Sequence, residues 1–394
     1  MMIQAVLGNP NHPEYGVATI PFPIPHDQYA HCMELLEALE IGDAVKTDCK
    51  VEAVDSFFSV LKRTEMLTVN VEELNYLAKR LDSFDTGEAA QFQAMAHKLE
   101  LFELKDLINL TFCCQQATVI TDFSDLAAIG RNHYMNLHGG SASVDELNAL
   151  DGKETARQLI ENGGGTITPY GVVYDNGMKL EPVYDGRFFP CYYYEPNAIT
   201  VAVTSKAEPE DTEHITWLFL PMIQEEVDRA LLRGGITDPA DARLRLEDSQ
   251  LPNEVDVLLD MEYETLFDLN ELAAATDGLS NADMEKLGAV VMLAKPKSAA
   301  QIKNLVESLD LFDFAPGAHT PQEYGKYMIQ QSGHFDYDEN LDAFYDYEKY
   351  GTERMNEEDG MFTGRGYIAY KGYTSLAEIM DGNQSSRIEM GGMA

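Results

Sequence analysis

The sequence of this chain repeats itself at a spacing of 195 residues, which limits the fold to two related halves. Residues 74–78 align with residues 269–273, where the order Leu-Asn, one variable residue, Leu-Ala recurs. A period this long that occurs only twice does not build a solenoid. We therefore predict two diverged copies of one unit, the first repeat at residues 1–190 and the second repeat at residues 191–394. Three glycine pairs keep the same spacing: Gly130 with Gly325, Gly171 with Gly366, and Gly177 with Gly372.

Each repeat is predicted to hold three small lobes of an α+β fold, arranged as an elongated chain. Short strands and a helix alternate in the first lobe, amphipathic helices with short links form the second, and the third mixes helix with strand. The predicted α+β lobes are residues 1–65 and 191–260, the helical bundles are residues 66–120 and 261–312, and the mixed lobes are residues 121–190 and 313–394.

The first lobes are predicted from short apolar runs that precede a helical pattern. Asp27 is placed as the N-cap of the helix in the first repeat, because a short polar side chain just before an apolar-periodic run is a typical helix start. The predicted strands are residues 3–6 and 17–20 in the first repeat and residues 199–203 and 215–220 in the second.

The helical bundles are predicted from apolar residues at i, i+3 and i+4. Asn70 is expected to cap the first helix of the first bundle, and Ser298 with Gln301 is expected to form a capping box in the second. Each mixed lobe is expected to end in a turn and a strand, at residues 168–174 and 363–370.

The charge of the chain is strongly negative and excludes several kinds of partner. Asp and Glu number 67 and Lys and Arg number 28, so the formal net charge is −39. Direct binding to nucleic-acid phosphates needs a basic face, and docking on an anionic membrane needs a basic patch. A net charge this large exceeds what solubility requires and costs stability through self-repulsion. The sequence therefore indicates that the negative field is used.

The compartment is predicted from apolar runs and cysteines. No run of about 18 apolar residues occurs, and the N-terminal residues lack a basic segment followed by an apolar one, so neither a membrane span nor a signal peptide is expected. The five cysteines show no CxxC spacing, which argues against a disulfide framework or a zinc site. Reduced thiols in a cytoplasmic protein are expected.

Catalytic motifs are missing from the sequence. It contains no GxSxG, Walker, HExxH or strand-associated GxGxxG pattern. His26, His31 and Cys32 have a spacing that does not place all three on one helix face. Cys113 and Cys114 could serve a Cys–His hydrolase, but they follow an apolar run and are expected to be buried. We therefore predict that the chain is not an enzyme and needs no cofactor.

One acidic stretch imitates the first half of a calcium-binding EF-hand loop. Asp336, Asp338 and Asn340 have the required spacing, but the sixth position is Leu341 where the loop needs glycine. The twelfth position is Tyr347 where the loop needs glutamate, so no metal site is predicted.

The acids themselves suggest a function. Duplex DNA carries one negative charge per about 1.7 Å, so 39 net charges match about 66 Å of duplex, or about 20 base pairs. An array of carboxylates can compete with DNA for a basic groove by the same release of counterions.

The aromatic residues among the acids, Phe344, Tyr345, Tyr347 and Tyr350, are expected in the core or in a subunit interface. The predicted partner-binding residues are Glu225, Glu226, Asp228, Asp336, Asp338, Glu339, Asp342, Asp346, Glu348, Glu353, Glu357, Glu358 and Asp359.

The second repeat resembles the ArdA-type antirestriction proteins. The resemblance rests on residues 324–327, on the Leu-x-x-Phe-x-Asp-Tyr-Glu-x-Tyr-Gly stretch at 341–351, and on residues 360–368. The first repeat shares this resemblance mainly because it matches the second repeat at the spacing of 195 residues. Two departures from the family pattern are Thr352-Glu353 in place of Arg-Asp after Gly351, and the doubling of a unit that is usually single.

The resemblance implies a dimer-forming mimic of bent DNA that inhibits type I restriction-modification enzymes and protects incoming mobile-element DNA. It implies contact with the DNA-binding subunits of such an enzyme, and a possible homodimer. Three alternatives stay open from the residues alone. The acids could block another DNA-binding machine (a CRISPR effector, a nucleoid protein or a repressor), the chain could be an acidic scaffold or chaperone for basic proteins, or it could be an unrecognised enzyme.

Overall fold

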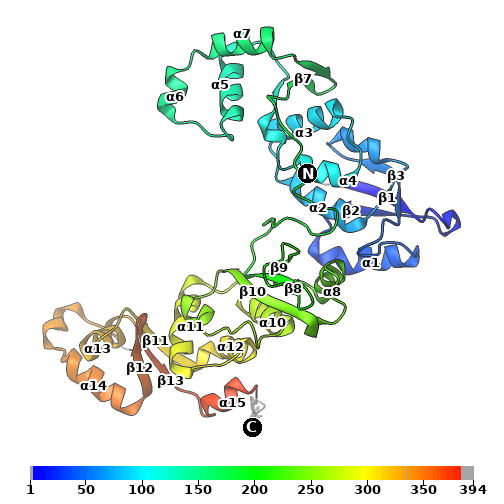
Figure 1. The fold of residues 1–394 in the computed structure, drawn as a ribbon. Helices are drawn as coiled ribbons and strands as arrows, with labels where there is room; N and C mark the ends of the chain where they lie inside the picture. The colour runs from blue at the N-terminus through cyan, green and yellow to red at the C-terminus, as the bar shows by residue number, and fades with distance from the viewer. Residues whose placement is uncertain (1–2, 335, 383–394) are drawn as a thin grey trace, which may run out of the picture. The chain divides into compact units, whose positions relative to one another are not determined.

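The computed structural model describes residues 3–334 and 336–382, so the ends of the predicted lobes at residues 1–2 and 383–394 lie outside the described residues. The chain divides into two compact units (Figure 1). Unit 1 comprises Met1–Glu195, Asp211–Thr216 and Ile223–Thr237, and unit 2 comprises Pro196–Glu210, Trp217–Met222 and Asp238–Ala394. Helices and small antiparallel sheets build both units, which confirms the predicted α+β class.

The first lobe of unit 1 is an antiparallel sheet with one helix beside it. Helix α1 (Tyr29–Ala38) buries the predicted face, but Asp27 is not its N-cap. Asp27 lies within a 3-10 turn, His26–Gln28, which leads directly into the helix. The strands lie in the order β2-β1-β3-β4, with bounds β1 Ile3–Gly8, β2 Val17–Phe22, β3 Cys49–Asp55 and β4 Thr68–Val69.

The second lobe of unit 1 contains the three predicted helices, α2 (Val71–Asp82), α3 (Thr86–Lys98) and α4 (Leu104–Leu110). Asn70 is confirmed as the N-cap of α2, because its side chain accepts hydrogen bonds from the N–H groups of Glu72 and Glu73. The apolar faces of the helices join the core of the first lobe.

The third lobe of unit 1 packs helices against a three-stranded antiparallel sheet of order β5-β7-β6. Its own small core contains Ile120, Ile129, Ala156, Leu159 and Tyr174. The elements are β5 (Thr118–Ile120), α5 (Leu126–Leu137), α6 (Val144–Ala149), α7 (Gly152–Asn162), β6 (Thr166–Thr168) and β7 (Gly171–Tyr174).

The second repeat contains a similar, but not identical, series of elements. Its first sheet contains β8 (Ile199–Ser205), β9 (Thr216–Leu220) and β10 (Ala242–Ser249), with α8 (Gln224–Arg233) between β9 and β10 in the chain. Its helices are α9 (Asn253–Asp256), α10 (Leu266–Thr276), α11 (Asn281–Ala294) and α12 (Ala299–Val306). Its last lobe contains β11 (Phe312–Pro316), α13 (Pro321–Gln330), α14 (Tyr347–Glu357), β12 (Asp359–Thr363) and β13 (Gly366–Tyr370), and α15 (Leu376–Met380) follows.

The sheets of the two repeats have matching strand orders. The order β2-β1-β3 of the first repeat corresponds to β9-β8-β10 of the second, and β5-β7-β6 corresponds to β11-β13-β12. One hydrogen bond repeats as well: Asn75 accepts from the N–H of Ile24 at 2.9 Å, and Asn270 accepts from the N–H of Met222 at 2.8 Å. Because Asn75 and Asn270 are 195 residues apart, these contacts support the predicted register.

A close contact between two helices also occurs in both repeats. In the first, a Cβ built on Gly130 of α5 would lie 1.8 Å from the carbonyl oxygen of Gly152 in α7. In the second, a Cβ on Gly325 of α13 would lie 2.0 Å from the carbonyl oxygen of Tyr347 in α14, beside Gly351. Glycine therefore lets each helix pair approach to backbone contact.

Two details of the second repeat differ from the sequence predictions. Ser298 caps α12, but Gln301 accepts from the N–H of Lys297 at 2.8 Å, where a capping box would have it accept from Ser298. Helix α8 belongs to the second repeat by sequence and to unit 1 by packing. The strands β3, β4 and β10 were not predicted from apolar runs, because charged residues alternate with apolar ones in β3 and β10, and β4 has only two residues.

Candidate partner-binding surface

Most of the predicted partner-binding residues lie in one stretch, residues 336–359, which we call the acidic segment. It runs from the loop after α13, through a 3-10 turn (Glu339–Phe344), along α14 and into β12 (Figure 1). Of the ten predicted acids in the segment, nine are exposed. The exposed acids are Asp336, Asp338, Glu339, Asp342, Asp346, Glu348, Glu353, Glu357 and Asp359.

Two of these acids also shape the backbone of the acidic segment. Asp338 accepts a hydrogen bond from the N–H of Asn340 and caps the 3-10 turn. Asp346 accepts from the N–H of Lys349 at 3.1 Å and caps α14. An anionic cap is favoured at a helix N-terminus because the free N–H groups there carry partial positive charge. The local fold therefore holds two carboxylates in place while they stay exposed.

Asp342 is an exposed carboxylate of the acidic segment that is held by three hydrogen bonds. Its Oδ1 accepts hydrogen bonds from the hydroxyl of Tyr337 at 2.7 Å, from Nε2 of Gln330 at 2.8 Å and from the hydroxyl of Tyr347. The bonds from Tyr347 and Tyr337 hold the pKa of Asp342 below its ordinary value. Asp342 is therefore a fixed, exposed anion, and the residues that orient it were not predicted. The equal spacing of Tyr337, Asp342 and Tyr347 was the available signal.

Helix α14 carries the remaining exposed acids on a solvated face. Glu353 lies 3.9 Å from Nζ of Lys349, a contact that is largely screened because both side chains are more than half exposed. Glu348 and Glu357 are exposed at the two ends of the helix. This face can present negative charge to a partner.

One predicted acid, Glu358, is turned inward. Its side chain is 14% exposed and forms an ion pair with Arg354. Its Oε2 also accepts a hydrogen bond from the hydroxyl of Tyr324 at 2.6 Å, and Tyr324 belongs to the core of this lobe. Glu358 therefore neutralises a cation and orders the core, and we leave it out of the proposed surface.

The aromatic residues of the acidic segment differ in burial. Tyr350 packs against the core of the lobe, whereas the side chain of Phe344 is 83% exposed. Tyr345 and Tyr347 have ring centroids 5.8 Å apart. The exposed ring of Phe344 is available to a partner chain.

The predicted acids of α8 lie in unit 1 and are not gathered with the acidic segment in one unit. Glu225 and Asp228 are exposed, and Asp228 accepts from Nε2 of Gln224 at 2.7 Å. Glu226 is mostly buried, with 16% of its side chain exposed, and its Oε2 lies 3.7 Å from Nδ1 of His26. Burial raises the pKa of the Glu226 carboxyl, so this residue is poorly suited to present a permanent charge.

The corresponding lobe of the first repeat carries less negative charge. Residues 321–357, from α13 to α14, contain nine acidic and three basic side chains, whereas residues 126–162, from α5 to α7, contain five acidic and three basic ones. The two lobes share strand order and helix packing. The two lobes therefore differ in charge while they share strand order and a close helix contact.

The two cysteines considered for catalysis lie outside the acidic segment. Cys113 and Cys114 are buried as expected, and burial raises the pKa of both thiols. Within residues 3–334 and 336–382, no group of three His, Cys, Asp or Glu side chains is arranged to hold a metal ion. No helix in the same ranges is both long enough and apolar enough to cross a bilayer.

The fold and the acidic segment define an acidic α+β protein whose two halves contain sheets of matching strand order. Residues 212–369 match the model of the antirestriction protein (ArdA) family. This match confirms the resemblance seen in the sequence and covers most of the second repeat, including the whole acidic segment. A search of curated proteins finds no match to the chain.

Proposed function

We propose that this chain is a DNA-mimic antirestriction protein that occupies the DNA-binding groove of a type I restriction-modification enzyme. The observation that carries the proposal is the set of nine exposed carboxylates in the acidic segment. The family match over residues 212–369 supports the antirestriction role. Within this proposal the chain works in the cytoplasm by occlusion, without catalysing a reaction and without a cofactor.

The physical basis is exchange of counterions. A DNA-binding groove that is lined with Lys and Arg holds DNA largely because bound phosphates release their counterions. Exposed carboxylates on a folded lobe can release counterions in the same way. Asp338, Asp342 and Asp346 are hydrogen-bonded in place, which lowers the entropy that they lose when a partner binds. The proposal needs an elongated body, and small-angle X-ray scattering would measure its dimensions.

The proposed partner is a DNA-binding subunit of the enzyme, not DNA itself. A homodimer of this chain is a further prediction, and the exposed ring of Phe344 is a candidate contact. Sedimentation of the wild-type chain and of Phe344→Ser would measure both the oligomer and this contact.

A pull-down experiment tests the proposed function. The tagged full-length chain is mixed with a purified type I methyltransferase and with duplex DNA as competitor, at rising salt. We expect the enzyme to be captured, duplex DNA to displace it, and capture to weaken steeply as salt rises. Capture that DNA does not displace would contradict the mimicry.

A second arm of the experiment separates the alternatives. The same pull-down is repeated with a DNA-binding protein unrelated to restriction, and with a basic protein that binds no DNA. Preference for the first of these would point to another DNA-binding target, and equal capture of the basic protein would indicate an acidic scaffold. We expect the chain to capture the methyltransferase in preference to both of these proteins.

A further inference from the structure

Helix α8 occupies an unusual place in the chain. By sequence it belongs to the second repeat, and the strands on either side of it, β9 and β10, pair with β8 in one sheet. By packing, Ile223–Thr237 belongs to unit 1. Two arginines of this helix, Arg229 and Arg233, are largely buried, with 16% and 7% of their side chains exposed.

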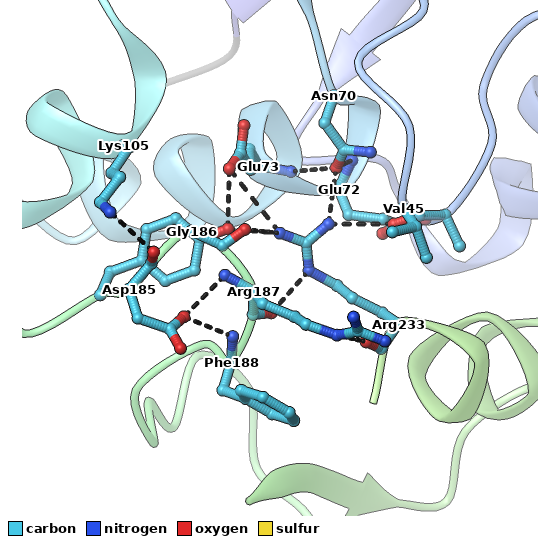
Figure 2. A network of polar contacts seen from close by, with 12 residues as sticks. Val45, Asn70, Glu72, Glu73, Lys105, Asp185, Gly186, Arg187, Phe188 and Arg233 are labelled. Atoms are coloured by element: carbon cyan, nitrogen blue, oxygen red, sulfur yellow. Dashed lines mark hydrogen bonds and ion pairs between the residues drawn. The ribbon is translucent and has the colours of Figure 1, made fainter. Parts of the chain in front are cut away.

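The guanidinium of Arg233 uses all five of its N–H donors (Figure 2). Burying a guanidinium is costly unless hydrogen bonds and a nearby opposite charge compensate the lost hydration. The acceptors come from three segments of unit 1, at residues 44, 70 and 184–187. They are the carbonyl oxygens of Ala44 at 2.9 Å, Gly186 at 3.2 Å and Arg187 at 2.9 Å, the Oδ1 of Asn70 at 3.0 Å, and the hydroxyl of Tyr184.

The charge of Arg233 is compensated within the same network. Oε1 of Glu73 lies 3.7 Å from Nη2 of Arg233 and accepts a hydrogen bond from the hydroxyl of Tyr184 at 2.7 Å. The ring of Phe189 lies against the guanidinium, with its centroid 4.4 Å away. Tyr184 therefore links the cation to the carboxylate.

Arg229 lies one helical turn earlier on α8 and binds the same part of unit 1. Its Nε donates to Oε1 of Glu72 at 2.7 Å, and its Nη2 lies 2.6 Å from the same oxygen. Nη2 also donates to the carbonyl oxygen of Gly42 at 2.7 Å. Consecutive acids at the start of α2, Glu72 and Glu73, thus each face one arginine of α8.

Asn70 ties this arrangement to the fold of the first repeat. Its Oδ1 caps α2 and accepts from Arg233, and its Nδ2 donates to the carbonyl oxygens of Asp43 and Lys46 at 3.1 and 2.8 Å. The loop at residues 42–46 and the start of α2 are therefore held together whether or not the arginine is present.

We propose that the first repeat contains a guanidinium-binding site, formed by residues 42–46, Asn70, Glu72, Glu73 and Tyr184, whose ligands are Arg229 and Arg233 of the second repeat. The site joins the two repeats of one chain.

The site is specific to the first repeat. At the spacing of 195 residues, Asn70, Glu72 and Glu73 correspond to Thr265, Phe267 and Asp268, and the side chain of Phe267 is 63% exposed. Arg229 and Arg233 correspond to Glu34 and Ala38 of α1. The second repeat therefore lacks the capping Asn and one of the two carboxylates, and the first repeat lacks the arginines.

The first test removes the ligand from the site in the full-length chain. Arg233→Ala should lower the melting temperature by about 10 °C, because it leaves buried acceptors and Glu73 without their cation. Limited proteolysis should cut within residues 223–237, where the wild-type chain resists. Arg245→Ala removes the same charge from an exposed side chain of β10 and should change neither readout. Equal behaviour of the two variants would overturn the proposal.

The second test uses chemical rescue. Millimolar guanidinium chloride should restore part of the lost melting temperature and the protease resistance of Arg233→Ala, and sodium chloride at the same ionic strength should not. Guanidinium does not restore Arg245→Ala. If guanidinium chloride lowers the melting temperature of Arg233→Ala as much as that of the wild-type chain, the proposed site is contradicted.

A milder variant keeps the test decisive if Arg233→Ala does not fold. Tyr184→Phe keeps the ring and removes only the hydroxyl that links Arg233 to Glu73. It should increase cleavage within residues 223–237 and lower the melting temperature by a smaller amount than Arg233→Ala. Combining Arg229→Ala with Glu72→Ala should cost less than the sum of the single changes. Additive losses together with unchanged cleavage in Tyr184→Phe would overturn the proposal.

Discussion

Glu254 and Arg365 form a two-point ion pair in the second repeat, with Nε to Oε1 and Nη2 to Oε2 both at 2.8 Å. Glu254 lies at the start of α9, and Arg365 lies in the turn between β12 and β13. At the spacing of 195 residues the first repeat has Ser59 and Tyr170, whose hydroxyls lie 3.0 Å apart. The same contact therefore joins the last hairpin to the rest of each repeat, with charge in one repeat and neutral groups in the other.

Replacing Arg365 should make stability depend less on pH. The hydrogen bonds from Arg365 hold the pKa of Glu254 below its ordinary value. The carboxylate therefore stabilises the fold above its unfolded pKa, and this contribution is lost as the pH falls through the lower folded pKa. Arg365→Ala should cost about 1 kcal/mol at neutral pH, and the difference from wild type should shrink below about pH 4. Urea unfolding of both proteins at several pH values measures this difference in stability.

Tyr170→Phe is the matched control for this prediction. It removes the neutral hydrogen bond with Ser59 at the equivalent place in the first repeat. Its cost should not change over the same acidic pH range. A pH-independent cost of Arg365→Ala would contradict the assignment to the ion pair.

Gly325→Ala should destabilise the last lobe. The added Cβ would lie 2.0 Å from the carbonyl oxygen of Tyr347, so α13 and α14 would have to separate. We expect a loss of about 2–3 kcal/mol in the free energy of unfolding, as for other overpacked sites. Gly364→Ala is the control, because its Cβ would meet no atom within 4 Å. Equal urea midpoints for the two variants would disprove the close helix contact.

Neutralising the acidic segment should weaken inhibition. Six acids that cap no helix are changed to their amides together, and the fold should remain intact because none of them is buried. The inhibition constant against a type I enzyme should rise, and its logarithmic salt slope should fall by up to about five. The six acids are Asp336, Glu339, Glu348, Glu353, Glu357 and Asp359.

The control for the acidic segment changes net charge equally in the first repeat. If charge alone matters, both six-fold variants weaken inhibition to the same extent. If the acidic segment is the contact surface, the control retains most of the inhibition. The control acids, all exposed, are Glu34, Glu37, Glu100, Glu103, Asp145 and Glu161.

Tyr347→Phe should raise the pKa of Asp342 towards its ordinary value. The hydroxyl of Tyr347 is the largest of the contributions that lower this pKa, and Tyr337 is the next. Carboxyl carbon shifts in an NMR titration report the change directly. Tyr373→Phe serves as the control, because Tyr373 is fully exposed. An unchanged titration of Asp342 in Tyr347→Phe would mean that the hydroxyl does not orient this carboxylate.

Asn75→Ala should cost about 1–3 kcal/mol, because the N–H of Ile24 would be left buried without an acceptor. Asn270→Ala should have a similar but smaller effect, since Asn270 is only half-buried. Asn148→Ala, at an exposed position of α6, should change stability by less than about 0.5 kcal/mol. Thermal unfolding of the three variants tests whether the repeated contact matters in both repeats.

The helices were predictable because their signals are local. A 3.6-residue apolar period and an Asn cap need no knowledge of distant residues, so α2, α3 and α4 were placed from sequence. The strands β3 and β10 contain no continuous apolar run, because charged residues alternate with apolar ones along both strands. This alternation is itself the local signal of a half-buried strand, so both strands were predictable from the sequence although they were not predicted.

The candidate surface was predictable as a region and not residue by residue. The density of acids marks residues 336–359 without any structure. Glu357 and Glu358 are neighbours in the chain, yet one is exposed and the other binds Arg354 and Tyr324. The direction of each side chain follows from the packing of α14 against α13, which composition does not encode.

The amino-acid sequence by itself determined the repeat, the α+β class, the helix faces and the excess of negative charge, because each is a property of residue order or number. Only the tertiary structure decided which acids are neutralised by a partner, as Glu72 is by Arg229, and which carboxylates are held in the open, as Asp342 is. The physical reason is that a charge acts through its distance to other groups. The chain brings Glu72 and Arg229 together across 157 positions of sequence.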